Sequence, residues 1–390
     1  MATGATTIKI NRRAVDRVRA RNLWVYRSDL IDTGAAREGE LVMVAGPRGQ
    51  TVGQALYSTR SQIALRIIAF DDRKIDRDFW LARLVAAERL RGEVVENATA
   101  FRLVYGESDL LPSLIIDRFN DCFVIQTLSQ GMEALKQMWV EILAERYGPR
   151  AIIERNEARV RDLEGMPRLS GVVYGADPGE IVIEEDGVWF AVNLVEGQKT
   201  GAFLDQRENR RAAENYARGR ALDCFTFQGG FALHLARRAD HVTALDISSA
   251  AISQGARNRD LNSATNVEFI EANVFDCLHA REQSGERFDL INLDPPAFAK
   301  NRASIEGASR GYKEINLRAM KMLVPGGTLI TSTCSYHMSE DAFLNVLAEA
   351  ASDAGRSARI VEKRTQSRDH PVLVSMPETY YLKCIILSVE

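Results

Sequence analysis

Residues 288–298 read Phe288-Asp289-Leu290-Ile291-Asn292-Leu293-Asp294-Pro295-Pro296-Ala297-Phe298. The first six are mostly apolar and predict a buried strand. The two prolines end it, because proline fixes φ and has no backbone N–H to continue a ladder. The next apolar run covers residues 326–334 and ends in Ser332-Thr333-Cys334-Ser335. A carboxyl group and a thiol are therefore predicted at the ends of two neighbouring strands.

Strand-like and helix-like segments alternate on both sides of this stretch. Predicted strands occupy residues 220–226, 241–247, 267–274, 288–294 and 326–334, and predicted helices occupy residues 229–238, 248–262, 311–323 and 339–355. This alternation is typical of a parallel, doubly wound α/β sheet. We expect the last apolar run, residues 380–389, to close one edge of that sheet.

The first half of the chain has a different pattern. Residues 8–73 contain short strand-like runs around a turn at 46–49, which is typical of a small β-rich unit. Residues 75–180 mix helix-like and strand-like segments, which indicates an α+β unit. Asp186-Gly187 predicts a tight hairpin within residues 181–192. We predict three domains, at residues 1–74, 75–180 and 181–390.

Composition excludes several classes of protein. The chain of 390 residues is 46% hydrophobic and 26% charged, which is ordinary for a globular protein. Its net charge of -3 does not indicate a nucleic-acid binder, but residues 1–30 hold seven basic and two acidic residues. That local excess can contact phosphate, or it can simply be the solvated face of a helix.

The five cysteines point to a reducing compartment. They stand at positions 122, 224, 277, 334 and 384 with no Cys-x-x-Cys pair, so neither a disulfide framework nor a zinc site is expected. We predict a cytoplasmic protein. No apolar stretch approaches the roughly 18 residues of a membrane span, so no membrane contact is expected.

Three predicted strand ends carry residues suited to one ligand. Asp223 opens a turn that leads to Gly229-Gly230, where the backbone can approach a ligand closely. The pattern is not G-x-G-x-x-G, which argues against a dinucleotide. Asp246 can accept both hydroxyls of a ribose, or it can cap the following helix. Asn273 can contact an adenine amine. The carboxylate of Asp223 opens a turn that lacks the third glycine of a pyrophosphate site. This favours a donor with a cationic amine, such as S-adenosylmethionine.

Four motifs together resemble those of a known family. The motifs are Gln198–Arg210, Asp223–Phe231, Asp294–Lys300 and Ser332–Ser335. They resemble class I, S-adenosylmethionine-dependent methyltransferases of large-subunit (23S) ribosomal RNA, and within these the branch that makes 5-methylcytosine and carries an N-terminal PUA domain. The similarity covers nearly the whole chain, although Asn22–Tyr26 departs from a His-Pro-Trp-type signature.

The resemblance implies a fold, partners and a reaction. The fold is a Rossmann-like methyltransferase domain with a seven-stranded doubly wound sheet, after an α+β domain and an RNA-binding PUA domain. The partner is ribosomal RNA, with no metal, and members are often homodimers. Cys334 is implied as the nucleophile that adds to C6 of a cytosine, with Asp294 at N3 and the base turned out of the stack.

The remaining site residues fall into two predicted groups. For the methyl donor they are Phe203, Asp205, Gln206, Arg207, Asp223, Phe225, Gly229, Gly230, Asp246, Ile247, Asn273, Asp294 and Pro295. For the RNA substrate they are Pro296, Phe298, Lys300 and Lys199. Many members carry a second cysteine where this chain has Pro296. The base that removes the C5 proton is therefore unassigned, and a water held by Asp294 is one option.

Two other functions are compatible with the sequence. A nitrogen of guanine or adenine can be methylated by the proline loop alone, without a thiol. In that case Cys334 is a small buried hydrophobe. Alternatively, the chain is a non-catalytic RNA-binding protein that acts through its basic N-terminal unit.

Overall fold

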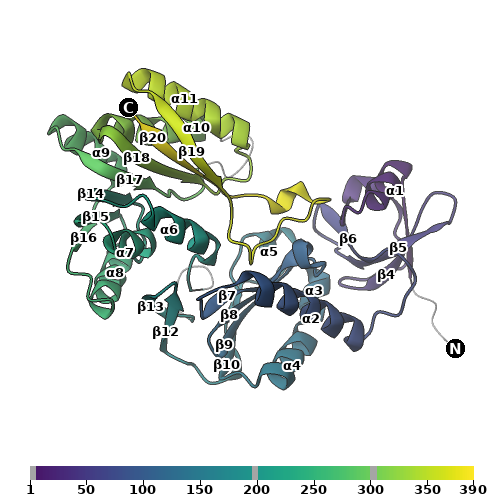
Figure 1. Ribbon diagram of the computed structural model, residues 1–390. Coiled ribbons are helices and arrows are strands. Elements are labelled where there is room, and N and C mark those ends of the chain that lie inside the picture. Colours follow the sequence, from purple (N-terminus) through teal and green to yellow (C-terminus); the bar gives the residue numbers. More distant parts are fainter. Residues whose placement is uncertain (1–5, 196–200, 299–304) are drawn as a thin grey trace. The chain divides into compact units, whose positions relative to one another are not determined.

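The computed structural model describes residues 6–195, 201–298 and 305–390 (Figure 1). The chain divides into two compact units. The first unit comprises Met1–Ile183, Val192–Leu204 and Arg368–Thr379. The second unit comprises Glu184–Ala191, Asp205–Ser367 and Tyr380–Glu390.

The first unit begins with a six-stranded sheet in the order β2-β6-β5-β4-β1-β3. The turn at residues 46–49 joins β4 and β5 into an antiparallel hairpin, which confirms the β-rich prediction. The helix α1 packs on the sheet through Ala14, Val15 and Val18. The elements are β1 (Thr7–Ile10), α1 (Arg12–Arg19), β2 (Trp24–Tyr26), β3 (Leu30–Asp32), β4 (Leu41–Ala45), β5 (Thr51–Tyr57) and β6 (Ile63–Ala69).

A second sheet of the first unit has the order β11-β10-β9-β8-β7. The side chains of Trp80 and Trp139 meet edge to face beneath it, with ring centroids 6.0 Å apart. This is the predicted α+β pattern. The elements are α2 (Arg77–Val94), β7 (Ala100–Tyr105), β8 (Leu114–Phe119), β9 (Cys122–Thr127), α3 (Gln130–Ala134), α4 (Lys136–Tyr147), β10 (Ala151–Asn156), α5 (Val160–Leu163) and β11 (Leu169–Gly175).

A two-stranded hairpin follows, from β12 (Glu180–Glu185) and β13 (Val188–Asn193). Its turn residues Asp186 and Gly187 both have positive φ, of 48° and 82°. Two consecutive left-handed residues are what a two-residue hairpin turn requires. The predicted tight turn is confirmed.

The second unit is built on a seven-stranded sheet in the order β16-β15-β14-β17-β18-β20-β19. The pairs from β16 to β18 are parallel, and β20 is antiparallel to both of its neighbours. The doubly wound prediction is confirmed. The strands are β14 (Arg220–Cys224), β15 (His241–Asp246), β16 (Val267–Glu271), β17 (Phe288–Leu293), β18 (Leu323–Thr333), β19 (Ala358–Arg364) and β20 (Lys383–Val389).

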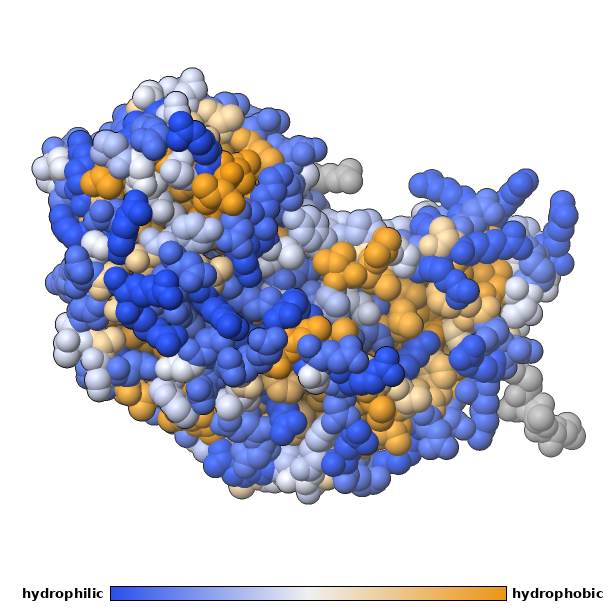
Figure 2. All heavy atoms as spheres, in the orientation of Figure 1, coloured by the Kyte–Doolittle hydropathy of each residue, from blue (hydrophilic) through white to orange (hydrophobic). Residues whose placement is uncertain are grey.

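The expectation that the last strand closes the sheet edge is wrong. β20 inserts between β18 and β19, and β19 forms the edge. Charged residues dominate β19, and its apolar Ile360 and Val361 are 46% and 50% exposed. Figure 2 shows an apolar surface area where β19 runs in Figure 1. A charged edge strand has a weak apolar pattern, so its sequence did not reveal it.

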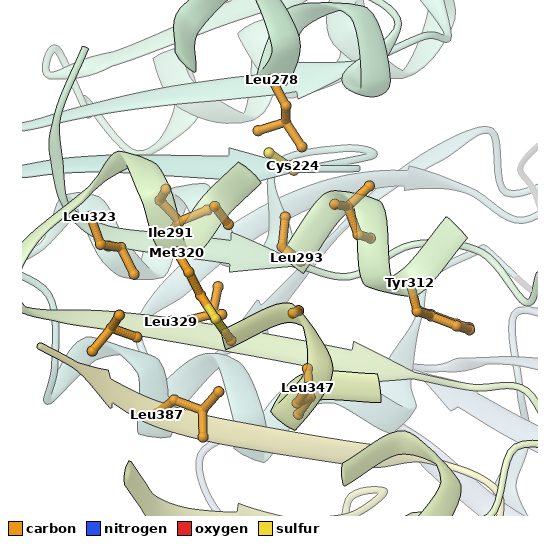
Figure 3. Packing of buried hydrophobic residues seen from close by; sticks show 14 of the residues in the cluster. Cys224, Leu278, Ile291, Leu293, Tyr312, Met320, Leu323, Leu329, Leu347 and Leu387 are labelled. Carbon is orange, nitrogen blue, oxygen red and sulfur yellow. The ribbon is translucent and has the colours of Figure 1, made fainter. Parts of the chain in front are cut away.

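Helices cover both faces of this sheet (Figure 1). On one face are α9 (Val274–Gln283), α10 (Ile305–Met322) and α11 (Glu340–Ala354). On the other are α6 (Arg207–Glu214), α7 (Gly230–Ala236) and α8 (Ser249–Leu261). Figure 3 shows the core under the first face, where Leu293 and Leu329 of the strands meet Leu278 and Met320 of the helices. Among the described residues, none of the helices is long and apolar enough to cross a bilayer.

Replacement of Leu278 by alanine tests this core. Leu278 is fully buried, so the change leaves a cavity and is expected to cost about 2–5 kcal/mol. The same change at Leu261, which is 44% exposed on α8, is expected to cost under about 0.5 kcal/mol. Hydrogen exchange of the β17 and β18 amides measures both effects. Equal protection in the two variants would contradict the packing described here.

Candidate active site

The carboxyl ends of five parallel strands meet at one edge of the sheet. β14 lies between β15 and β17. The chain therefore adds β15 and β16 on one side of β14, and then β17 and β18 on the other side. Backbone bonds join the ends: Thr226 N donates to Leu245 O at 2.9 Å, and Asp294 N donates to Cys224 O at 3.4 Å. Ligands of doubly wound folds bind at such a switch point.

The turn after β14 is held in an unusual conformation. Phe225 and Phe227 have φ of 64° and 51°, in the left-handed region that non-glycine residues rarely adopt. Such residues cost about 1–3 kcal/mol each and cluster at ligand sites. The hydroxyl of Thr226 donates to Asp223 Oδ2 at 2.6 Å and holds the turn in place. The strain supports a functional role for this turn.

Asp223 lies inside the protein, under this turn. Its side chain is fully buried and accepts bonds from Thr226 Oγ1 and from Asn292 Nδ2, at 2.6 and 2.8 Å. Burial raises the pKa of Asp223 to about 6, and the two hydrogen bonds oppose that rise. The observed role of Asp223 is to join the turn to β17. Its contact with a donor amine stays a prediction.

The two glycines after this turn are required by the protein itself. A Cβ atom on Gly229 would lie 2.7 Å from Phe269 Cζ, and one on Gly230 would lie 2.7 Å from Arg210 Nε. Gly229 also has a φ of 87°. Phe269 and Arg210 therefore approach these two glycines closely, as we had expected of a ligand. The contact of both glycines with the methyl donor stays a prediction.

Asp246 and its neighbours lie at the ends of β15 and β16. Asp246 accepts backbone bonds from Phe227 N and Ser248 N, both at 2.9 Å. Ser248, rather than Asp246, caps α8. Ile247 is 69% exposed beside it and offers an apolar surface to a flat ring. Asn273 is exposed and accepts from Phe275 N at 2.9 Å, so it caps α9.

Asp294 follows β17 and has a perturbed acidity. Burial and the nearby carboxylate of Asp205 raise the pKa of Asp294 to about 7. Gln206 Nε2 donates to Asp294 Oδ1 at 2.8 Å, and Asn209 Nδ2 donates to Gln206 Oε1 at 2.6 Å. The Gln206 amide is therefore held in one orientation. Near neutral pH Asp294 exists as both acid and carboxylate, which suits a group that gives and takes a proton.

The segment before α6 supplies the other predicted donor residues. Asp205 accepts the Tyr381 hydroxyl at 2.6 Å. Arg207 is 1% exposed and lies 3.5 Å from the Glu208 carboxylate. Phe203 is half-buried just before the short 3-10 helix Leu204–Gln206. Lys199 and Lys300, both predicted to bind substrate, lie outside the described residues.

The proline loop is anchored by its aromatic residue. Pro295 is buried and Pro296 is exposed. The ring of Phe298 lies 4.7 Å from that of Tyr312 and 6.4 Å from that of Phe225, centroid to centroid. Phe298 thus packs against the protein, and its contact with a base stays a prediction.

Cys334 comes directly after β18 and is half-buried. Leu293 pairs with Thr331 across the two parallel strands. Asp294 and Cys334 therefore leave neighbouring strands at the same edge. None of the five cysteines forms a disulfide, and those at 122, 224 and 384 are fully buried. No cluster suited to a metal ion occurs within the described ranges.

Several residues of the site were not predicted. Asn292 bonds to Asp223, and a polar residue inside an apolar run was a usable signal, because buried polar groups need partners. Tyr381 bonds to Asp205 and Tyr312 packs on Phe298. Neither stands in a motif, so only the fold reveals them.

Comparison with known proteins agrees with this geometry. A family model described as S-adenosylmethionine-dependent methyltransferase matches residues 167–378, and one for a PUA-like domain matches residues 8–70. Ribosomal RNA large subunit methyltransferase I of Aliivibrio fischeri is 40% identical over 94% of this chain and 95% of its own. The protein of that name from Tolumonas auensis is 39% identical over 98% and 99%.

A solved structure shares the whole fold. It is that of SMU.776, described as a methyltransferase complexed with SAH. It covers 98% of this chain and 100% of its own with a TM-score of 0.84, at 18% sequence identity. At that identity the likeness supports the fold alone.

Replacement of Asp294 by asparagine tests its acidity. Its pKa is raised from 3.8 to about 7, so the native state binds more protons than the unfolded state between these values. Stability therefore falls as pH rises through this window. Asparagine cannot ionise, so we expect a gain in melting temperature at pH 8 and a smaller gain at pH 5. The exposed Asp276→Asn serves as control. A gain independent of pH would contradict the assignment.

Proposed function

We propose a function from one premise: the chain belongs to the S-adenosylmethionine-dependent methyltransferase family that includes ribosomal RNA large subunit methyltransferase I. It is an enzyme that uses S-adenosylmethionine to methylate large-subunit ribosomal RNA. The finer proposal is that the methyl group goes to C5 of a cytosine through a covalent adduct with Cys334. One observation carries it: Asp294, with its raised pKa, and a half-buried thiol follow two paired parallel strands.

The residues at the switch point fit the methyl donor. Asp246 ends β15, where a carboxylate can meet ribose hydroxyls. Ile247 offers an exposed apolar surface next to it. The strained turn from Phe225 to Gly229 sits above the end of β14. We assign the donor to these loops, together with Asn273 and the segment Asp205–Arg207. When bound, S-adenosylmethionine supplies an electrophilic methyl group.

Cys334 and Asp294 share the first step on the cytosine. The Cys334 thiolate adds to C6 and forms a carbon–sulfur bond. The C5–C6 electron pair then forms a C4–C5 double bond, and the C4–N3 pair moves onto N3, which takes the proton of Asp294 as the acid. C5 then has the character of an enamine and can accept the methyl group. A carboxyl group with a pKa of about 7 is suited to this donation near neutral pH.

In the last stage of the proposed reaction, Cys334 leaves C6 and Asp294 takes back its proton from N3. Once C5 carries the methyl group, its proton must leave; a water held by the Asp294 carboxylate is the proposed base. The carbon–sulfur bond breaks, the double bond between C5 and C6 returns, and Cys334 leaves as thiolate. N3 returns its proton to Asp294. The net proton goes to solvent, and the enzyme is unchanged.

The N-terminal helix is proposed to contact RNA phosphate. Arg12 and Arg13 occupy the first turn of α1 and are exposed, and no acidic residue stands there. Cations at that end oppose the helix dipole, so they do not stabilise the helix. By contrast, Arg17 pairs with Asp29 and serves the fold. The exposed arginines are thus available to a polyanion.

Two further expectations remain predictions. The family resemblance implies a homodimer, and the cysteine pattern of the sequence predicts a reducing, cytoplasmic location. Methylation of a ring or exocyclic nitrogen is the competing chemistry. It requires no thiol, so Cys334 distinguishes the two reactions.

Replacement of Cys334 by alanine is expected to lower methylation of ribosomal RNA by at least about a thousandfold. Donor binding should persist, because the thiol acts on the base. Mass spectrometry of RNA nucleosides measures 5-methylcytosine, and calorimetric titration measures S-adenosylmethionine binding. Cys277→Ala, at a half-buried cysteine on α9, is the matched control and should stay active. Normal turnover by Cys334→Ala would refute the covalent route.

Replacement of Arg12 and Arg13 by alanine is expected to weaken RNA binding without loss of stability. For every phosphate that the helix no longer neutralises, the slope of log affinity against log salt should fall by about 1. Filter binding across a salt series measures this slope. The double variant Arg238→Ala/Arg287→Ala removes two exposed arginines of the second unit and is the control. Equal slopes for both variants would exclude α1 from the RNA interface.

A further inference from the structure

A buried lysine lies opposite the residue that precedes the proposed nucleophile. Lys383 is the first residue of β20 and is only 3% exposed. Lysine is almost never buried so far unless it is paired, because removing an ammonium from water costs several kcal/mol. In the antiparallel pairing of β18 with β20, Lys383 lies opposite Thr333, the residue before Cys334. Cys334 follows directly after this pair, where β18 ends.

The Lys383 ammonium can bind an anion in addition to its contacts with Tyr381 and Tyr380. Its Nζ donates to Tyr381 O at 3.2 Å and lies 5.1 Å from the centroid of the Tyr380 ring. An ammonium group has three donors. Burial lowers the pKa of Lys383, while charge interactions with Glu340 and with Cys334 raise it. Burial is the larger effect, so the pKa of Lys383 is lowered overall, and negative charge at Glu340 or at Cys334 would favour the ammonium form.

The second anion has partners of its own. Glu340, at the start of α11, receives the Tyr380 hydroxyl at 3.0 Å and Lys363 Nζ at 2.7 Å. These bonds hold the pKa of Glu340 below its usual range. Much of the negative charge of Glu340 is thus compensated by Lys363 of β19.

The turn that carries Cys334 is fixed on both sides. Thr333 Oγ1 donates to the Tyr312 hydroxyl at 2.8 Å, and that hydroxyl lies 3.0 Å from Ser335 Oγ. Ser335 N donates to Thr333 Oγ1 at 3.2 Å. Burial raises the pKa of Tyr312, and the charge of Cys334 acts in the same direction, so its phenol stays neutral. These bonds fix Thr333 and Ser335, the residues on either side of Cys334.

We propose that Lys383 is a positioning residue that holds Cys334 as thiolate, by setting a buried ammonium beside it at the carboxyl edge of the sheet. The inference rests on the proposed function, because it takes Cys334 as the nucleophile. Lys383 stays protonated throughout the reaction. The proton of the thiol passes to solvent before C6 is attacked, so the lysine supplies charge and gives up no proton.

The pH dependence of Cys334 alkylation tests this proposal. Full-length enzyme, without donor or RNA, is treated with iodoacetamide from pH 5 to 10, and peptide mass spectrometry follows residue 334 alone. An unperturbed cysteine ionises near pH 8.5. We expect a clearly lower midpoint in the parent, and a rise of about one unit or more in Lys383→Met, which keeps the apolar length. Lys383→Arg restores the charge and should restore the midpoint.

Activity gives a second measurement on the same variants. At pH 7.5 the kcat of Lys383→Met should fall about fivefold, as expected when the midpoint of ionisation rises by one unit from near that pH. It should recover towards the parent value at pH 9.5, where the thiol ionises unaided. A purely structural defect would not recover with pH. Lys313→Met, which removes a lysine from α10 that pairs with Glu349 and Asp353, is the control and should leave both profiles unchanged.

Two outcomes would overturn the inference. One is a pH midpoint of Cys334 alkylation at or above about 8.5 in the parent enzyme, a result that can be obtained without any variant. The other is the same midpoint in the parent and in Lys383→Met. Failure of the covalent mechanism is a separate result: Cys334→Ala would then stay active, even if the thiol midpoint is low and depends on Lys383.

Discussion

The parallel pairing of β17 with β18 is the constraint on which the site depends. Parallel strands end at the same edge, so the residues that follow them must meet there. Leu293 pairs with Thr331, and this register brings the loop after β17 beside the loop after β18. A slip of one residue would turn every side chain of the strand to the opposite face. The apolar core of Figure 3 prevents such a slip, because Ile291 and Leu329 are buried against the helices.

The site contains two carboxyl groups, Asp223 and Asp294, whose pKa values are raised by burial. A desolvated carboxylate is unfavourable unless hydrogen bonds or charges compensate it. Asp223 is compensated by Thr226 and Asn292, and its pKa rises only to about 6. Asp294 has Gln206 as donor but also the carboxylate of Asp205 nearby, and its pKa reaches about 7. The difference between these two aspartates follows from their neighbours. Asp223 serves as a structural anchor, whereas the higher pKa of Asp294 supports its proposed role as proton donor.

The sequence predicted the elements whose patterns are strong. The apolar runs located β14 to β18, and the Asp-Pro-Pro and Thr-Cys-Ser motifs located both catalytic candidates. It did not reveal β19, because a charged edge strand lacks an apolar pattern. It explained Gly229 and Gly230 by a ligand, and it did not reveal that Phe269 and Arg210 also approach them closely. Contacts between residues far apart in the chain, such as Lys383 opposite Thr333, depend on strand order. No local pattern encodes them.

The insertion of β20 next to β18 places Tyr381, which lies just before this strand, in contact with two charged residues of the site. These residues are Asp205 and Lys383. The Tyr381 hydroxyl donates to Asp205 Oδ2 at 2.6 Å, and its carbonyl accepts from Lys383 Nζ at 3.2 Å. Burial and then Asp205 raise the pKa of Asp294, and Lys383 is the cation that we propose to act on Cys334. Tyr381 thus contacts one residue linked to each catalytic candidate. An edge strand in the place of β20 would leave these charges in water, where their interactions are weaker.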